Sequence, residues 1–522
     1  MDEIRKMLEE YTGRELKPWH MPGHKRKPVF PGMWSEMFRR DVTEVPGTDD
    51  LHHATGAIRR SQEAAAEAVG AAYSHYLVGG STAGILAAVS ALTKLWREGR
   101  EITGESPIFL VGANCHKSVW NGLRLVGAKT LLLEPSGDPV YGSVLADRLL
   151  SVLSEDVDDT GMVAGCILTS PTYAGAISPL GELHAVLQVY GIPMIVDEAH
   201  GAHLPFCSEL EQESGVACGA EYVIQSLHKT LPALTQTAVL YVGGRRDEDD
   251  FEFTETDGYT PEILEEVIGE ELAVFQSSSP SYLLMLSAEQ AVSWAERNRD
   301  RFDSYIEGMR SFREELARDL KQLELAELPG VQDPSRLMLR VKGKDRQEGK
   351  DEAALTTGTG MAKWLEEECG IVAELSGSRE LILISTVCDE EADLDELKEA
   401  LLKLDRAVKR ERDRVRRSRA GRKKREEKHR EEKRPSGEEN SSGEGNHPSE
   451  TSHPVGKIED PREEGAVSAS VQVLPQVGDF VQRDIYVYPP GVPILRSGER
   501  VTEAARKRLE EEQAAGRRIY GL

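Results

Sequence analysis

The sequence has few cysteines and no hydrophobic run long enough to cross a membrane. Its six cysteines are scattered over 522 residues without a Cys-x-x-Cys pair, which argues against both a disulfide framework and a zinc site. The first residues lack the pattern of a secretory signal peptide. These absences predict a cytoplasmic protein with reduced thiols, without a metal site and without a membrane as partner.

Basic residues are also in the minority. Lysine and arginine number 64 against 90 aspartates and glutamates, and the resulting net charge of −26 argues against nucleic acid as a partner. Residues 406–434 are the exception, with 16 basic and 6 acidic residues and a local net charge of +10. Because this run is interrupted by acidic residues and has no aromatic side chain for base stacking, we favour a solvated helix followed by a linker. A tether for nucleic acid or an anionic surface stays open as an alternative.

The chain is too long for one core, and its middle part repeats a pattern of strand, turn and helix. From about residue 75 to residue 245, apolar strand-like runs alternate with helical segments. This alternation predicts an α/β fold with a mainly parallel sheet and helices on both faces. A second, smaller α/β unit is expected to begin with one long helix over residues 291–320.

These patterns predict five parts of the chain. They are an N-terminal segment (1–50), a large α/β domain (51–290), a small α/β domain (291–405), a charged and disordered linker (406–465) and a C-terminal domain (466–522).

Polar clusters follow four of the predicted strands. They are Gly79–Thr82, Asn114–His116, Asp197–His200 and Ser226–Lys229. In parallel α/β sheets, ligands bind outside the carboxyl ends of the strands. The four clusters are therefore expected to form one shared pocket.

Each cluster alone has an ordinary explanation. The Gly-Gly-Ser-Thr run could be a tight turn with a helix cap, His116 could cap the next helix, and Asp197 and Lys229 could form structural ion pairs. Together, however, a phosphate-binding turn, a stacking histidine, an aspartate and a lysine are the parts that hold pyridoxal phosphate. The combination therefore favours this cofactor.

The chain resembles the Orn/Lys/Arg decarboxylase family of fold-type-I pyridoxal-phosphate enzymes. The motifs that carry the resemblance follow one another in the family's order. They are HMPGHK (20–25), DVTEVPGTDDLHH (41–53), VGGSTAG (78–84), NCHKS (114–118), SPTYAG (170–175), VDEAHGAH (196–203), QSLHKTLPALTQ (225–236), SSSPSY (277–282) and YPPGVPILRSGE (488–499).

The resemblance implies a seven-stranded, mainly parallel sheet and a role for each matching residue. Lys229 would bind the cofactor covalently, Asp197 would pair with the pyridine nitrogen, and His116 would stack on the ring. The other cofactor contacts that it implies are Ser81, Thr82, Ser226 and His228 at the phosphate and His200 beside the cofactor. The residues that it places near the entrance or the subunit interface are His20, His24, Asp49 and Asp50.

Ser277 matches a hydroxyl that, in the family, reaches the phosphate of the neighbouring subunit. The resemblance therefore implies a homodimer, or a dimer of dimers, with active sites at the subunit interface. Because HMPGHK begins at residue 20, the family's N-terminal wing domain is expected to be absent.

The implied reaction is decarboxylation of a basic amino acid to the corresponding amine and CO2. Lys229, His228 and Asp197 are the expected catalytic residues, with Lys229 or His228 returning a proton to Cα. Another reaction on the same fold, such as transamination or aldol cleavage, is the alternative. Arginine, lysine and ornithine all remain candidate substrates, and Glu374 is expected near the substrate channel.

Overall fold

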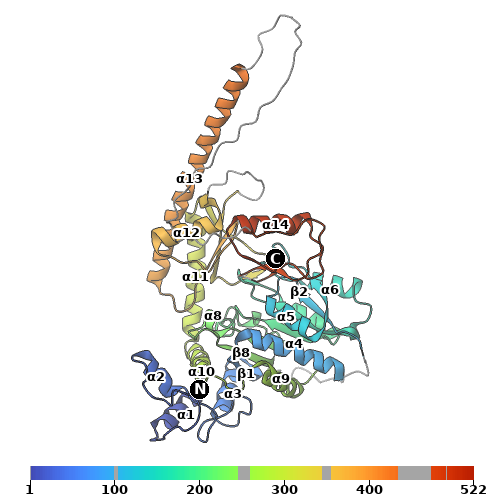
Figure 1. Ribbon diagram of the computed structural model, residues 1–522, viewed down its shortest axis with the longest axis vertical. Helices are drawn as coiled ribbons and strands as arrows, with labels where there is room; N and C mark the ends of the chain where they lie inside the picture. Colours follow the sequence, from blue (N-terminus) through green and yellow to red (C-terminus); the bar gives the residue numbers. More distant parts are fainter. Residues whose placement is uncertain (1, 99–103, 245–258, 344–353, 433–471, 489–490) are drawn as a thin grey trace, which may run out of the picture.

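A computed structural model describes residues 2–98, 104–244, 259–343, 354–432, 472–488 and 491–522 (Figure 1). Within these ranges, no helix has both the length and the apolar content that a membrane span requires. The helices are α1 (Glu3–Gly13), α2 (Met33–Arg40), α3 (Ala57–Val69), α4 (Gly80–Glu98), α5 (Lys117–Val126), α6 (Ala146–Glu155), α7 (Leu180–Val189), α8 (Leu227–Thr230), α9 (Pro261–Phe275), α10 (Tyr282–Arg297), α11 (Arg299–Asp319), α12 (Gly358–Cys369), α13 (Glu391–Glu432) and α14 (Glu503–Ala514).

The strands belong to four sheets. They are β1 (Ala71–Leu77), β2 (Ile108–Gly112), β3 (Lys129–Leu133), β4 (Val163–Thr169), β5 (Ala176–Ile177), β6 (Met194–Asp197), β7 (Tyr222–Gln225), β8 (Ala238–Gly244), β9 (Leu323–Leu325), β10 (Val331–Gln332), β11 (Arg336–Val341), β12 (Leu375–Ser376), β13 (Glu380–Ile384), β14 (Ile485–Val487), β15 (Pro493–Leu495) and β16 (Ile519–Tyr520).

The large sheet has seven strands in the order β1-β8-β7-β6-β4-β2-β3. Only β8 runs against the others, since it pairs antiparallel with both β1 and β7, whereas the remaining neighbours are parallel. The carboxyl ends of the other six strands therefore meet at one edge. This sheet confirms the predicted α/β fold.

Side chains of the large sheet alternate between two buried cores. Leu110 and Val223 belong to the core under α3, α6, α7 and α10, while Phe109 and Ile224 belong to the core under α4, α5 and α9. Successive side chains of a strand point to opposite faces, so a sheet covered on both sides needs apolar residues at nearly every position. This requirement explains why the strands appear in the sequence as unbroken apolar runs.

Two smaller units complete the fold. A four-stranded antiparallel sheet, in the order β12-β13-β11-β9, packs against α11, α12 and α13. A three-stranded sheet, in the order β15-β14-β16, packs against α14 near the C-terminus. Figure 1 shows α14 above the large sheet. The last part of the chain contacts both other units, because Glu511 of α14 pairs with Arg379 beside the four-stranded sheet and Tyr488 packs against His116.

The expected single helix over residues 291–320 is wrong. Two helices, α10 and α11, meet at Asn298, whose backbone dihedral angles (φ −125°, ψ 33°) are not helical. Its side-chain amide donates a hydrogen bond of 2.6 Å to the carbonyl oxygen of Trp294. Asparagine competes with the backbone for such bonds, which favours a helix end at this position.

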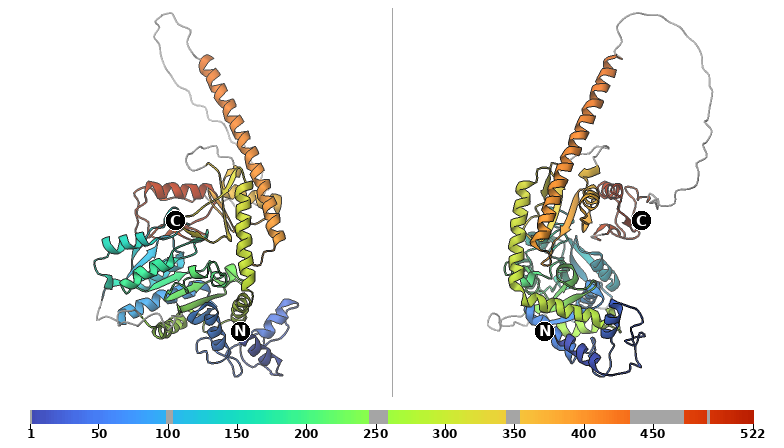
Figure 2. Two further views of the ribbon diagram at one scale, coloured as in Figure 1. Left: turned by 180° about the vertical axis from the view of Figure 1, so that it is seen from behind. Right: turned by 90° about the vertical axis from the view of Figure 1, so that its left-hand side faces the viewer.

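Residues 406–432 form the solvated helix that the charge pattern favours, so the expected linker does not begin at residue 406. Helix α13 continues to Glu432, and its first part is held on the small sheet by buried Leu401, Leu404 and Val408. Beyond this contact the helix extends away from the rest of the chain (Figure 2). Extending a formed helix needs no new nucleus, which explains how so polar a segment stays helical. Residues 433–465, the rest of the expected linker, lie outside the described residues.

Asp405 joins α13 to the first strand of the four-stranded sheet, β9. Its buried carboxylate oxygen Oδ1 accepts hydrogen bonds from the backbone N–H groups of Lys321 (3.0 Å), Gln322 (2.6 Å) and Leu323 (2.8 Å). Substitution by alanine leaves these three donors without an acceptor. We expect Asp405→Ala to lower the free energy of unfolding by roughly 2 kcal/mol or more, measured by urea denaturation. Asp395→Ala, an exposed position on the same helix, is the control, and equal urea midpoints for the two variants would contradict the assignment.

Candidate active site

A cavity of about 210 Å³ lies at the carboxyl ends of the large sheet's strands. All four polar clusters contribute to its wall. Eight of the nine expected cofactor residues line it, namely Ser81, Thr82, His116, Asp197, His200, Ser226, His228 and Lys229. The topology explains this meeting, because each cluster follows a strand that ends at the same edge.

Ser277, the ninth residue, does not line this cavity. It is exposed just after α9, its carbonyl oxygen lies 2.8 Å from Nε2 of His52, and its hydroxyl accepts from the N–H of Ser279. Within one chain, Ser277 therefore takes no part in the site.

Four N-terminal residues also lie away from the cavity. His24 pairs with Asp41 at 3.1 Å, and His20 lies 3.0 Å from the hydroxyl of Tyr11. Asp49 accepts hydrogen bonds from the N–H groups at the start of α3, and Asp50 contacts His53. Asp49 thus has a structural role as a helix cap.

Lys229 presents its amine to the buried side of the cavity. Its Nζ lies 3.0 Å from Nε2 of His200. Burial lowers the pKa of Lys229, with Asp197 acting in the opposite direction. Burial, Lys229 and Arg336 together hold the pKa of His200 well below its usual range, so this ring is neutral and accepts the hydrogen bond. The lysine amine is therefore closer to its nucleophilic, neutral form than an exposed lysine is.

Asp197 is a buried carboxylate at the end of β6, with 2% of its surface exposed. Burial raises its pKa, and the charge of Lys229 and a hydrogen bond from the N–H of Ala199 (3.3 Å) act against this shift. Among the described residues, no lysine or arginine forms an ion pair with it. A buried, unpaired carboxylate is energetically unfavourable, so a cationic group bound in the cavity next to Asp197 would stabilise it.

Hydroxyl groups and a helix N-terminus lie together at one end of the cavity. Helix α4 begins at Gly80, and the hydroxyls of Ser81 and Ser226 lie 2.6 Å apart. Gly80 has a φ of +72°, a conformation that favours glycine and turns the chain into the helix. His228 donates through Nδ1 to the carbonyl oxygen of Thr237 at 2.9 Å. These donors suit a phosphate group.

His116 caps α5 and also forms part of the cavity wall. Its Nδ1 lies 2.8 Å from the hydroxyl of Ser118. Burial, together with Lys229 and Lys117, lowers the pKa of His116 to about 4, so the ring is neutral at pH 7. A neutral, flat ring is suited to stacking on an aromatic ligand.

The C-terminal unit completes the cavity. The ring of Tyr488 lies edge-on to His116, with 6.3 Å between the ring centroids, and Val492 also lines the wall. Gly491 has a φ of +82°, and a Cβ there would lie 3.4 Å from the His116 ring. The sequence signal for this contact was the YPPG run itself, but no pattern within one chain indicates which distant residues it touches.

Tyr173 and Asn114 are two further wall residues that were not among the expected cofactor contacts. The Tyr173 ring lies 4.7 Å from that of His200. Asn114 donates to the carbonyl oxygen of Gly142 at 2.9 Å, which holds the loop before α6 against the cavity.

The residues present fit pyridoxal phosphate. Lys229 offers an amine of lowered pKa, Asp197 a buried carboxylate without a cation, and α4 with its neighbouring hydroxyls a phosphate site. Nδ1 of His200 is also buried without a hydrogen-bond partner in the described part of the chain. An anionic group at one end of the cavity and a cationic ring near Asp197 would satisfy these groups.

Glu198 is a second buried carboxyl group, directly after Asp197. Its oxygens accept from Nε2 of Gln225 (2.6 Å) and from the N–H of Gly215 (2.8 Å), and none of its surface is exposed. Burial raises the pKa of Glu198 to about 8, although both hydrogen bonds act against this shift. It links the ends of β6 and β7 behind the cavity as a protonated group at neutral pH.

Comparison with known proteins identifies one family. A family model described as "Orn/Lys/Arg decarboxylase, major domain" matches residues 4–332. The chain is 34% identical over 297 residues to the uncharacterised protein YaaO of Bacillus subtilis, covering 56% of each chain. It is 25% identical to an arginine decarboxylase of Bacillus anthracis, covering 98% of this chain and 93% of the other.

Solved structures share the fold. The constitutive lysine decarboxylase of Escherichia coli aligns with a TM-score of 0.66 at 18% identity, covering all of this chain and 80% of the other. The lysine decarboxylase LdcF of Francisella novicida aligns with a TM-score of 0.63 at 19% identity, covering 78% of this chain. The present chain spans 60% of the length of LdcF and 56% of YaaO.

The dependence of stability on pH tests whether the buried Glu198 carries a proton in the folded protein. The folded pKa of about 8 lies above the ordinary 4.5, so the stability that the group contributes is complete below pH 4.5 and is lost as the pH rises through 8. Glu198→Gln removes this titration. We expect its stability relative to the unsubstituted protein to rise with pH, by at most about 1.4 kcal/mol per pH unit, in urea unfolding at pH 5 and pH 8. The exposed Glu182→Gln is the control, and parallel pH profiles for all three proteins would show that Glu198 is ionised when folded.

Proposed function

The chain belongs to the Orn/Lys/Arg decarboxylase family, and from this we propose that it decarboxylates a basic amino acid with pyridoxal phosphate as cofactor. One observation carries the proposal. In a single cavity, a lysine amine whose pKa is lowered by burial lies with a buried carboxylate that has no ion pair among the described residues. Shared fold alone would not support this step, because the same fold hosts many reactions.

The roles of the residues follow from their environments. When bound, pyridoxal phosphate supplies an electron sink for the electron pair that remains on Cα when CO2 leaves. Asp197 would hold the positive charge at the ring nitrogen, and Ser81, Thr82, Ser226 and His228 would bind the phosphate. His116 would stack on the ring, and His200 would lie beside the cofactor. All seven are proposed contacts.

Lys229 would act twice. Its amine, whose pKa is lowered by burial, would hold the cofactor covalently, and the same amine would carry a proton to Cα. Loss of CO2 breaks the bond between Cα and the carboxyl carbon, and a proton delivered by Lys229 or His228 takes the place of the carboxylate. Burial of the amine keeps bulk water from competing for this step.

Arginine is the substrate that we propose first. Three curated relatives that each align with at least 95% of this chain are named arginine decarboxylase, whereas a lysine decarboxylase of Pseudomonas aeruginosa covers 61% of this chain at 23% identity. Lysine and ornithine remain the alternatives that the same assay compares.

We also propose that the active unit is at least a homodimer. Ser277 is exposed and lies outside its own chain's cavity, although it matches a family position that reaches the neighbouring phosphate. A second copy would bring this hydroxyl to the site. The dimer would then have two composite active sites related by symmetry.

The first test is release of CO2 by the purified protein with added pyridoxal phosphate, offered arginine, lysine and ornithine separately. We expect release from arginine above the other two, and loss of at least about a thousandfold in Lys229→Ala because the covalent cofactor contact is absent. Product analysis separates amine and CO2 from the keto acid of a transaminase or the aldehyde of an aldolase. Cofactor binding without CO2 from any of the three would overturn the proposal.

A mixing experiment tests the composite site. Ser277→Ala is expected to weaken cofactor affinity, and Lys229→Ala to abolish activity. In a hybrid dimer of these two variants, one site would combine an intact Lys229 with an intact Ser277 of the other chain. Coexpression should therefore restore high-affinity cofactor binding and activity to about one site in two of each hybrid. If the hybrids match the Ser277→Ala protein in cofactor affinity, Ser277 does not reach across.

A further inference from the structure

Glu374 carries an exposed carboxylate beside the active-site cavity. The hydroxyl of Tyr173 donates a hydrogen bond to it, and Tyr173 itself lines the cavity next to His200. Glu374 is also close enough to Lys229 to oppose, together with Asp197, the effect of burial on the pKa of that amine. Within the described ranges, no lysine or arginine forms an ion pair with Glu374. A negative charge next to the site therefore has a neutral hydroxyl as its hydrogen-bond partner.

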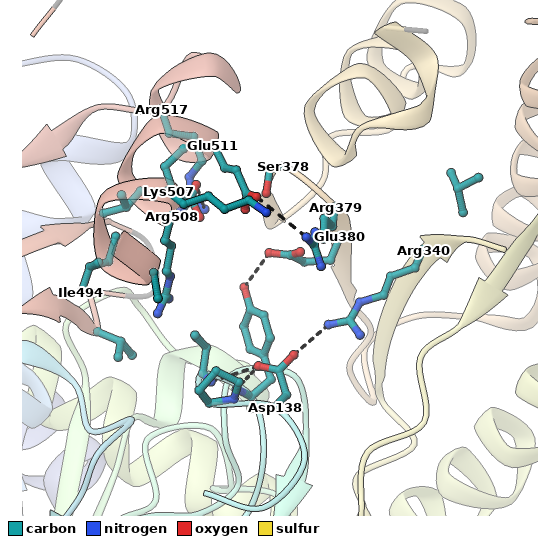
Figure 3. Close-up of a pocket in the computed structure, with 18 of the residues that line it drawn as sticks. Asp138, Arg340, Ser378, Arg379, Glu380, Ile494, Lys507, Arg508, Glu511 and Arg517 are labelled. Carbon is teal, nitrogen blue, oxygen red and sulfur yellow. Dashed lines mark hydrogen bonds and ion pairs between the residues drawn. The ribbon is translucent and has the colours of Figure 1, made fainter. Parts of the chain in front are cut away.

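The backbone of Glu374 belongs to a hairpin of the small sheet. Its N–H donates to the carbonyl oxygen of Ile382 at 3.1 Å, and β12 and β13 follow directly. At the tip of the hairpin, Glu380 accepts from the hydroxyl of Tyr141 at 3.1 Å, and Arg379 pairs with Glu511 of α14 at 3.8 Å (Figure 3). The hairpin thus contacts both the large domain and the C-terminal unit.

These contacts form a closed network beside the cavity, and Thr172 and Tyr173 are its members that line the wall. The hydroxyl of Thr172 donates to the carbonyl oxygen of Tyr141 at 2.8 Å, so the loop that carries Tyr173 is tied to the loop that holds Glu380. Tyr173 then returns to Glu374 on the same hairpin. Glu374 is therefore held in position by its backbone hydrogen bond to Ile382, by the hydroxyl of Tyr173 and by the contacts of its hairpin. A side chain that is held in this way is preorganised to bind a ligand.

We infer that Glu374 binds the distal cation of the substrate side chain, with Tyr173 holding its carboxylate in position. This inference rests on the proposed function. A basic amino acid places one positive charge at the far end of its side chain, away from the Cα atom that must lie at Lys229. A carboxylate pairs with a guanidinium through two parallel hydrogen bonds and with an ammonium through one, so Glu374 would make arginine the better-held substrate.

The test is a comparison of Glu374→Gln with the unsubstituted holoenzyme. We expect KM for arginine and lysine to rise about tenfold or more, while kcat changes less than about threefold, because the lost contact lies away from the reacting bond. Affinity for agmatine, the amine that arginine leaves after loss of CO2, should fall by a similar factor in calorimetry. The preference for lysine over norleucine, which has the same length without the charge, should fall about tenfold as well.

Three further variants make the result specific. Glu396→Gln removes an exposed charge from the same unit and should leave KM unchanged. Tyr173→Phe should raise KM by a smaller factor than Glu374→Gln, since the carboxylate remains. Glu374→Asp keeps the charge, should give an intermediate KM, and serves if the glutamine variant does not fold.

The two proposals fail in different ways. If the unsubstituted protein releases CO2 from no basic amino acid, the proposed function is wrong. If, in addition, Glu374→Gln binds agmatine as tightly as the unsubstituted protein does, the inference is wrong as well. If the protein is an active decarboxylase whose KM in Glu374→Gln equals that in Glu396→Gln, the inference alone is wrong. A fall in kcat without a rise in KM also overturns it, because this would place Glu374 in the chemical step.

Discussion

Burial of ionisable groups at one edge of the large sheet is the constraint on which the site depends. Asp197 and Lys229 both lose solvation there, and burial acts on them in opposite directions, toward the acid form of one and the amine form of the other. The charge of each group opposes the effect of burial on the pKa of the other. This balance depends on the distance between the two groups, which the surrounding structure must therefore hold constant. The parallel strands β6 and β7 do so, because Asp197 is the last residue of β6, and β7 leads through Ser226 into the short helix α8 that carries Lys229.

The rest of the wall is assembled from parts of the chain that are far apart. Gly80 begins α4, Tyr173 follows β4, and Tyr488 arrives from the C-terminal unit. Arg336 adds a further link, since its fully buried guanidinium donates to the backbone oxygen of His200 at 3.1 Å and thereby connects the small sheet to the residue beside Lys229. A change in the position of either smaller unit would therefore be transmitted to the cavity.

The sequence was sufficient for the frame and for most of the cavity wall because both depend on local patterns. Continuous apolar runs marked strands covered on both faces, and a polar cluster after each run marked the edge where side chains such as His116 and Lys229 meet. The break at Asn298 was missed because the apolar periodicity continues through it. The charge pattern favoured a helix after residue 406, but composition does not reveal that this helix is continuous with the anchored turns before it. The contacts of Tyr488 and Tyr173 depend on tertiary packing between units, for which no periodicity exists.

The long projecting part of α13 affects how the protein moves in water. Arg412 still donates hydrogen bonds to Gln322 and Lys342. A helix rises about 1.5 Å per residue, so the 20 residues from 413 to 432 reach roughly 30 Å beyond the packed part. Such an arm adds friction without adding much mass, and elution from a sizing column follows friction. The chain will therefore elute earlier than a compact protein of its 57.7 kDa, and its mass in solution is better read from light scattering.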